Sequence, residues 1–367
     1  MTSDMQARAT GPLPITLEEI TPQWLTHAFR QKFPGVSIER AEIVDMIRGT
    51  CTKIRLRLEP DQAGRDAGIP PTVILKGGFE PHSREMCHMH QVEALAYGEV
   101  IPAYPLQSPE CYFAGYDAQR RQGIVIIEDL VARGVRFCHP QTPQSFVEVA
   151  RRLSALAAFH AQTWGSPELE PGGRWGDTHN VIAAFAPYMG QFFREDIWRG
   201  WIESPRGAAV SVCFHDMHWM RETLDKLVSF SAPLPRCLIH GDTHLGNLYV
   251  DPDGTPGFFD PQTHQSPAMY EVAYHVAGAL DTADRARWER PLVQHYLVEL
   301  ARHGVAAPGL DAAMHQYAAY LALGYCIFLV NANDFQTEAV NTAYTARFSA
   351  AMLDNNTLEV LAAIPAG

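Results

Sequence analysis

Eight residues about two thirds of the way along the chain carry the side chains best suited to chemistry. The segment HGDTHLGN, residues 240–247, places two histidines, an aspartate and an asparagine between short apolar runs. A further aspartate, Asp260, ends the next apolar run, GFF, and the intervening DPDG is typical of a tight turn. We therefore expect a hairpin that returns Asp260 close to Asn247.

This set of oxygen-bearing side chains suits a hard cation. Carboxylate and amide oxygens are ligands that Mg²⁺ accepts, and this ion takes the rest of its shell from water and substrate phosphates. The pattern predicts a phosphoryl-transfer site in which Asn247 and Asp260 hold the metal and Asp242 is free to accept a proton. Gly241 and Gly246 would let the backbone bend around it.

A zinc site is the competing interpretation, because His240 and His244 lie four residues apart. The segment lacks the glutamate of the zinc-protease helix motif, and its glycines oppose a continuous helix. The interpretation as a phosphoryl-transfer loop instead makes both histidines structural supports of the loop.

Composition limits the class of protein. The 367 residues are enough for two lobes, and a formal net charge of -12 argues against a nucleic-acid partner. Seven scattered cysteines without a Cys-x-x-Cys pair favour a reducing, cytoplasmic compartment. No signal-peptide pattern and no run of about 18 apolar residues is present, so no membrane span is expected.

The surrounding pattern predicts an α+β protein of two lobes. Residues 1–36 read as a tail and a helix, residues 37–130 as a small, mostly antiparallel sheet lobe with one helix, and residues 131–367 as a larger, mostly helical lobe carrying the hairpin. Within the helical lobe, one of the expected helices runs from 270 to 303. The chain contains neither the P-loop pattern nor the G-x-S-x-G pattern of hydrolases.

HGDTHLGN followed by FFDPQ resembles the signature of the aminoglycoside phosphotransferase and choline kinase superfamily, and most closely its ecdysteroid-kinase-like branch. The resemblance implies a protein-kinase-like, bilobal fold. It implies ATP and Mg²⁺ as cofactors and a small-molecule hydroxyl compound as acceptor. It also implies Asp242 as the catalytic residue, Asn247 and Asp260 as metal ligands, and His240 and His244 as supports of the loop.

The same resemblance also implies nucleotide-binding residues in the sheet lobe. It implies Lys76 in TVILK as the phosphate-binding lysine and Glu93 in HQVEALAY as its partner. The segment IRGTCTK, residues 47–53, offers Gly49 and Thr50 for a turn over the phosphates. In GIVIIEDL the Glu128 carbonyl and the Leu130 amide are the expected adenine contacts.

Two positions depart from the family pattern. Pro261 stands where the family often has tryptophan, and Glu271 stands where an aspartate usually steadies the catalytic loop. The longer side chain of Glu271 is expected to take over that support. Neither departure removes a catalytic group.

The function expected is an ATP-dependent small-molecule kinase. A catalytically silent nucleotide-binding protein of the same fold and a metal-dependent phosphohydrolase are the alternatives. The acceptor stays open between aminoglycoside, choline-like and sterol-like alcohols. Aromatic residues are frequent in the region expected to bind the acceptor, where they fit either a pocket wall or the core.

Overall fold

The computed structural model describes residues 12–49 and 51–365. The chain divides into two compact units. The first contains the residues up to Arg136 together with Gly257–Thr263, and the second contains Phe137–Pro256 and the residues from His264 onward. The lobe boundary that the sequence predicts, after Leu130, remains a prediction.

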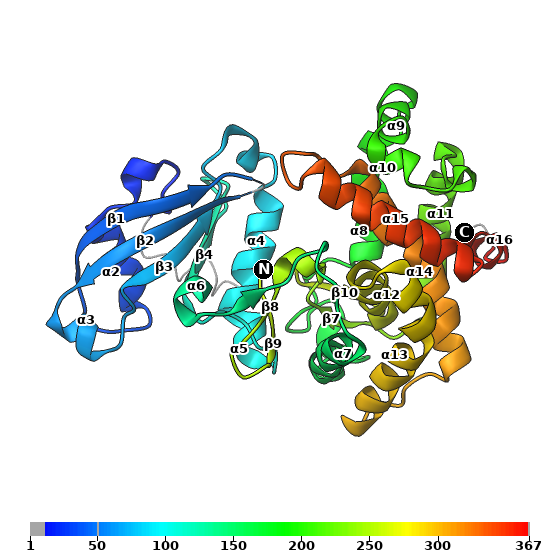
Figure 1. The fold of residues 1–367 in the computed structure, drawn as a ribbon. Helices are drawn as coiled ribbons and strands as arrows, with labels where there is room; N and C mark the ends of the chain where they lie inside the picture. The colour runs from blue at the N-terminus through cyan, green and yellow to red at the C-terminus, as the bar shows by residue number, and fades with distance from the viewer. Residues whose placement is uncertain (1–11, 50, 366–367) are drawn as a thin grey trace. The chain divides into compact units, whose positions relative to one another are not determined.

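The first unit is built on a five-stranded antiparallel sheet in the order β1-β2-β3-β5-β4 (Figure 1). Helices and short turns precede the sheet, connect its strands or follow it. The elements are η1 (Leu17–Glu19), α2 (Pro22–Arg30), β1 (Ile38–Ile47), β2 (Thr52–Pro60), α3 (Gln62–Asp66), β3 (Thr72–Gly77), η2 (Pro81–Arg84), α4 (Cys87–Leu95), a π-turn (Ala96–Val100), α5 (Ile101–Ala103), β4 (Cys111–Asp117), β5 (Gln122–Glu128) and α6 (Leu130–Arg133).

Strand alternation gives this sheet two different faces. Ile124 and Ile126 of β5 point into a core shared with α2, whereas Val125 and Ile127 pack with α4. The one helix that the sequence predicts in the sheet lobe corresponds to α4 with the π-turn that follows it. Lys76 follows Leu75 of the α2 core, so its side chain lies on the face that α4 covers.

The second unit is mostly helical. Its elements are α7 (Phe146–Ala161), η4 (Pro167–Leu169), α8 (Val181–Met189), η5 (Gly190–Phe192), α9 (Glu195–Ile202), α10 (Pro205–Ala208), η6 (Val212–Phe214), α11 (Met217–Ser231), β7 (Cys237–Ile239), η7 (Leu245–Asn247), β8 (Leu248–Val250), β10 (His264–Ser266), α12 (Ala268–Ala279), α13 (Thr282–Arg302), α14 (Leu310–Val330), α15 (Glu338–Asp354) and α16 (Thr357–Ala362). β6 (Arg136–Phe137) and β9 (Pro256–Phe258) contain points where the chain passes between the units.

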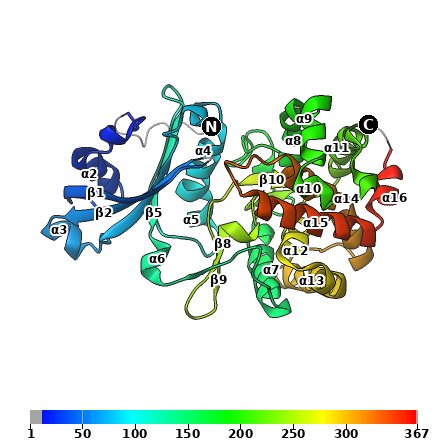
Figure 2. The same ribbon diagram turned by 45° about the horizontal axis from the view of Figure 1, so that its top comes forward.

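Helices α12 and α15 pack against helix α14 of this unit (Figure 2). By length and hydropathy it is the one helix of the described residues that could cross a membrane. However, 78% of its most apolar window is buried inside the protein. Its apolar character is therefore that of a core helix.

The helix that the sequence predicts over 270–303 is not continuous. The pattern over 270–303 is divided into α12 and α13, because Leu280 is extended and Asp281 begins the next helix at its N-cap position. Both segments have continuous apolar periodicity, so the sequence pattern alone did not mark the break. The predicted DPDG turn does form, since the Asp251 amide donates to the Thr255 carbonyl at 2.9 Å and Gly254 has φ +87°.

Candidate functional site

The first cluster of predicted site residues surrounds Lys76 of β3. Its buried ammonium group forms an ion pair with Glu93 of α4 and a second with Asp260, at 2.6 Å from Oδ1. All three residues belong to the first unit, because the segment Gly257–Thr263 is part of it. Three residues that the motif comparison predicts for nucleotide and metal binding are thus in direct contact.

Asp260 occupies a constrained position in this cluster. Its φ is +55°, in the left-handed region that few residues other than glycine adopt, although aspartate tolerates it better than most. The Asp260 amide donates to the hydroxyl of Tyr97 at 3.2 Å, and Oδ2 accepts from the ammonium of Lys53 at 2.8 Å. Backbone strain of this kind is concentrated at functional positions.

Opposite charges determine the protonation of this cluster. Burial alone would raise the pKa of the Asp260 carboxyl, but the charges and hydrogen bonds of Lys53 and Lys76 lower it. Burial opposes the charge of Lys76, whereas Asp260 and its other neighbours raise its pKa well above the usual value. The lysines and Asp260 are therefore ionised at neutral pH.

The predicted phosphate turn and adenine contacts also belong to the first unit. The carbonyl of Gly49 lies 2.9 Å from Nε2 of His82, whereas Thr50 lies outside the described residues. Glu128 is the last residue of β5, and Leu130 is the first residue of α6. A residue at the first position of a helix has no partner for its N–H within that helix, so the Leu130 amide is suited to an external acceptor.

The second cluster is the loop that follows β7 in the second unit. β7 pairs with β10 in antiparallel register, and the chain then enters HGDTHLGN with Gly241 at φ +86°. Asn247 donates through Nδ2 to Asp242 Oδ2 at 2.7 Å and to the Asp242 carbonyl at 3.1 Å. Because its amide nitrogen is used in this way, the amide oxygen of Asn247 is the atom that can face a cation.

Glu271 of α12 supports the base of this loop. Its carboxylate accepts from the backbone amides of His240, at 3.0 Å, and Gly241, at 2.6 Å. The same carboxylate lies 2.9 Å from Nε2 of His160, a fully buried histidine of α7. Burial would raise the pKa of Glu271, but the hydrogen bond and charge of His160 lower it. The carboxylate therefore stays charged and able to hold the loop amides.

His240 and His244 both bond to backbone amides within the loop. The Asp242 amide donates to Nδ1 of His240 at 3.3 Å, and the Gly246 amide donates to Nδ1 of His244 at 2.9 Å. Nε2 of His244 lies 3.5 Å from Asp242 Oδ2 and 3.1 Å from the amide nitrogen of Gln336. His244 therefore lies between the Asp242 carboxylate and Gln336.

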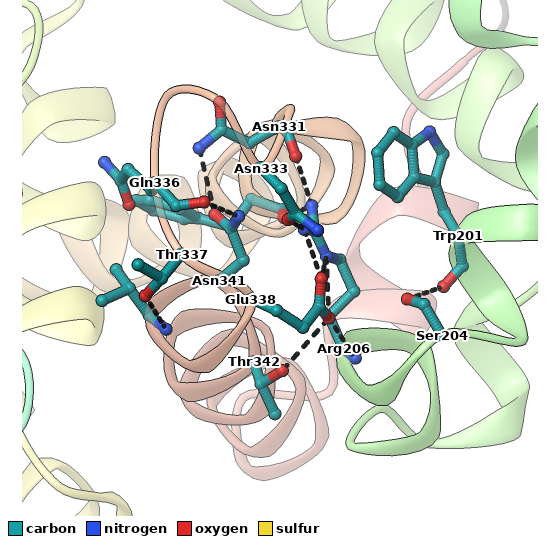
Figure 3. A network of polar contacts seen from close by, with 12 residues as sticks. Trp201, Ser204, Arg206, Asn331, Asn333, Gln336, Thr337, Glu338, Asn341 and Thr342 are labelled. Atoms are coloured by element: carbon teal, nitrogen blue, oxygen red, sulfur yellow. Dashed lines mark hydrogen bonds and ion pairs between the residues drawn. The ribbon is translucent and has the colours of Figure 1, made fainter. Parts of the chain in front are cut away.

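Gln336 belongs to the segment 331–337, which a buried arginine anchors (Figure 3). Arg206 of α10 is fully buried and donates from Nη2 to Glu338 at 2.6 Å. It also donates to the carbonyl of Asn331 and to the side chain of Asn333, and its guanidinium lies 4.6 Å from the Trp201 ring. The segment is thus held at both ends by one side chain.

Asn341 of α15 adds further restraint on this segment. Its side chain donates to the Gln336 carbonyl at 3.1 Å and accepts from the Asn331 side chain at 3.0 Å (Figure 3). Figure 3 shows these amide groups next to one another between the segment and α15. The position of Gln336 beside His244 therefore follows from contacts with buried parts of α10 and α15.

Some polar residues of these clusters were not predicted. Lys53 was one basic residue among several in an alternating strand, and Gln336 carried no motif. Tyr274 of α12 donates its hydroxyl to Asp242 Oδ1 at 3.0 Å. Burial, followed by the charge of Asp242, raises the Tyr274 pKa well above its usual value, so this hydroxyl remains a donor.

Many aromatic residues in the region expected to bind the acceptor are instead core residues. Tyr344, Phe328 and Phe348 pack with Tyr274 beside the loop, and the rings of Phe328 and Tyr344 are stacked at 4.0 Å. Others among the candidate wall residues are also buried, namely Trp198, Phe193, Tyr320 and Tyr325. These buried rings therefore say nothing about the acceptor, whereas Tyr188 of the same region is exposed.

Comparison with protein families identifies the central part of the chain. Residues 130–308 match the family model described as the phosphotransferase enzyme family. The matched segment contains the HGDTHLGN loop and Asp260. A comparison with curated protein sequences found no match.

Solved structures share the fold. A choline kinase from Cryptosporidium parvum Iowa II is 11% identical at a TM-score of 0.56, with 93% of this chain and 99% of that chain covered. A protein from Ralstonia eutropha JMP134, assigned to the aminoglycoside phosphotransferases, is 14% identical at a TM-score of 0.51, with 90% and 97% covered. At such low identity the likeness establishes the fold, which is the predicted kinase-like α+β fold with a sheet lobe and a helical lobe.

The family match confirms the resemblance drawn from the loop motif at the level of the superfamily. The ecdysteroid-kinase-like branch is not distinguished by these comparisons. The segment 130–308, which carries the HGDTHLGN loop, is therefore a phosphotransferase-family segment.

Proposed function

We propose that the protein is a magnesium-dependent kinase that transfers the γ-phosphoryl group of ATP to a hydroxyl group of a small molecule. The observation that carries this proposal is the contact of Lys76 with both Glu93 and Asp260. Lys76 is a buried lysine with two carboxylate partners, and its strand lies next to a candidate adenine-binding strand. A phosphohydrolase does not require such a lysine. The lysine suits a nucleotide whose phosphates need a fixed cation.

Nucleotide binding is assigned to the sheet lobe. In this proposal the Glu128 carbonyl and the Leu130 amide bind adenine, and Gly49 and Thr50 belong to the turn over the phosphates. Lys76, oriented by Glu93, holds the phosphates that are not transferred. Such sites act mainly by positioning and by neutralising charge.

Magnesium is assigned to Asp260 and Asn247. Among the residues that the structure describes there is no group of three or more His, Cys, Asp or Glu side chains suited to hold a metal ion. A Mg²⁺ site with one carboxylate and one amide oxygen fits, because this ion usually keeps waters and binds substrate phosphates. When bound, the ion would supply positive charge to the phosphate oxygens. The two residues lie in different units, so their joint role rests on the motif.

Asp242 is assigned to the acceptor. Its carboxylate would orient the acceptor hydroxyl and accept the proton as that oxygen attacks phosphorus. The hydrogen bonds from Tyr274 and Asn247 fix the direction of both carboxylate oxygens. We further propose that the protein acts in the cytoplasm, since its scattered cysteines are all free thiols.

A screen of nucleotide consumption tests this proposal. The protein is incubated with Mg·ATP or Mg·GTP and a library of hydroxyl compounds, and products are identified by mass spectrometry. A product heavier by one phosphoryl group identifies both the donor and the acceptor. Phosphate release without a phosphorylated product would support a phosphohydrolase, and nucleotide binding without turnover across the library would support a catalytically silent binding protein.

A further inference from the structure

Lys53 is a second lysine at the position where phosphates are expected. It lies on β2 directly opposite Lys76 of β3 in the antiparallel register. Directly opposed residues of neighbouring strands project from the same face, with Cβ atoms about 5 Å apart. Two ammonium groups at such positions repel each other, so this arrangement requires an anion between them.

Asp260 is that anion in the nucleotide-free protein. Its Oδ1 lies 2.6 Å from Lys76 Nζ, and its Oδ2 lies 2.8 Å from Lys53 Nζ. The charge of Asp260 raises the Lys53 pKa, against the opposing effect of burial. One carboxylate therefore holds two cations, each through a different oxygen.

The two lysines differ in what else holds them. Lys76 has Glu93 as a second carboxylate partner, and its side chain is 3% exposed. The Lys53 side chain is 36% exposed, and Asp260 is the carboxylate with which it forms an ion pair. If the oxygens of Asp260 turn to a magnesium ion, Lys76 keeps a counter-ion whereas Lys53 loses its own.

We propose that Lys53 is a second phosphate-binding lysine, which pairs with Asp260 in the free protein and with a phosphate oxygen in the nucleotide complex. This inference rests on the proposed function, since it requires that a nucleotide and a metal bind here. The phosphates of the nucleotide would bind together with the cation that Asp260 holds. A phosphate oxygen would then replace the Asp260 carboxylate as the anion paired with Lys53. Lys53 also ends the segment 47–53 that is expected to cover the phosphates.

The local structure allows this exchange of partners. Lys53 has a flexible four-carbon stem, and its ammonium lies 5.9 Å from the centre of the Phe259 ring. The strand position is fixed by neighbours in the core, because Ile54 and Leu56 on the other face are buried. A change at Lys53 should therefore alter the charge of the site and leave the sheet in place.

Calorimetric titration of the full chain with Mg·ADP and with adenosine tests the proposal. Lys53→Gln should weaken Mg·ADP binding about tenfold or more, because a charge-assisted contact to phosphate is lost. Its affinity for adenosine should be unchanged, since adenosine has no phosphate. Lys53→Arg, which keeps the charge, should retain most of the affinity for Mg·ADP.

Arg57→Gln is the matched control. Arg57 lies on the same strand and the same face, and it forms an exposed ion pair with Glu42, so this variant removes one positive charge outside the cluster. It should bind Mg·ADP as the unmodified protein does. Equal losses in Lys53→Gln and Arg57→Gln would overturn the proposal, because they would show a general charge effect.

Two other outcomes would also overturn it. If Lys53→Gln loses adenosine and Mg·ADP affinity equally, Lys53 acts on the fold and not on phosphate. If it binds Mg·ADP normally while the unmodified protein binds it well, Lys53 serves only to neutralise Asp260. Failure of the unmodified protein to bind any nucleotide would instead refute the proposed function itself, and the inference with it.

Discussion

The Asp242 carboxylate accepts hydrogen bonds on both of its oxygens, from Tyr274 on one and from Asn247 on the other. His244 lies near the second oxygen as well. An acceptor hydroxyl that approaches this carboxylate meets a group whose orientation is already determined. Preorganised groups of this kind lower the cost of reaching the transition state.

Asp242→Asn removes the proton acceptor and its charge with little change in shape. The rate of phosphoryl transfer should fall at least about a hundredfold, since general-base groups contribute about 10²–10⁴-fold. This corresponds to roughly 2.7 kcal/mol of lost transition-state stabilisation. The measurement is kcat with the acceptor found in the screen, accompanied by titration with Mg·ATP. Loss of nucleotide affinity would instead place Asp242 at the metal.

Tyr274→Phe tests whether the orientation of Asp242 matters. Removing the hydroxyl leaves Oδ1 of Asp242 without this hydrogen-bond donor. We expect kcat to fall about tenfold, which corresponds to about 1.4 kcal/mol of transition-state stabilisation. The KM for nucleotide should stay the same, because the Tyr274 hydroxyl donates to Asp242 and not to a residue assigned to nucleotide binding.

Tyr325→Phe is the control for that variant, since Tyr325 is also fully buried and donates to the Phe214 carbonyl at 2.8 Å. It should lose a similar amount of stability and keep its kcat. A comparable drop in kcat for both variants would mean that Tyr274 acts only through packing.

At the scale of elements, the segment 331–337 joins α14 to α15 near the loop. It lacks helix and strand structure, yet it carries Gln336 to His244. Its position depends on Arg206, which is fully buried and whose charge is matched by Glu338. A buried arginine without a carboxylate is costly, so this pair keeps the segment in one conformation.

Glu338→Gln should destabilise the protein at pH 7 by about 3 kcal/mol, because it leaves the Arg206 charge buried without its partner. The hydrogen bond from Arg206 lowers the pKa of Glu338, so the stabilisation is present above the unfolded value of about 4.3 and is lost as the pH falls through the folded value. Urea unfolding should therefore show a large difference between variant and unmodified protein at pH 7 and a smaller one near pH 3.

Glu359→Gln provides a comparison, because it removes the same charge from an exposed residue of α16. It should change stability little at either pH. A Glu338→Gln defect that stays constant from pH 7 to pH 3 would show that packing, and not the ion pair, accounts for the loss.

At the scale of the whole molecule, the candidate groups are divided between two compact units. Lys76, Glu93 and Asp260 lie in the first, and Asp242 and Asn247 lie in the second. The segment Gly257–Thr263 belongs to the first unit although the chain on either side of it belongs to the second. The Phe258 amide donates to the Gln107 carbonyl at 2.9 Å, which ties this segment to the sheet lobe.

Mg·ATP should raise the melting temperature of the protein, because a ligand that binds only the folded state stabilises it by about 2.7 kcal/mol at 100 times its dissociation constant. In Asp260→Asn the free protein should melt lower, since Lys76 and Lys53 lose their shared anion, and the further increase with Mg·ATP should shrink. Differential scanning calorimetry with and without nucleotide measures both effects. A normal increase in Asp260→Asn would show that Asp260 is not a metal ligand.

The sequence determined the parts of the site that reside in short, contiguous motifs. HGDTHLGN and the following FFDPQ indicated the superfamily, and TVILK and HQVEALAY identified Lys76 and Glu93, which are ion-paired in the structure. The α+β fold followed from the change of pattern near residue 130. Local patterns carry this information because catalytic loops and strand alternation involve neighbouring residues.

Only the tertiary structure showed the groups that act through distant neighbours. Lys53 meets Asp260 across 207 residues, and Arg206 meets Glu338 across 132. Whether Lys53 opposes Lys76 depends on the register of β2 against β3, and a shift of one residue would turn it to the other face of the sheet. Register, the break at Leu280 and the burial of the aromatic residues are settled by packing of the whole chain, which no short pattern encodes.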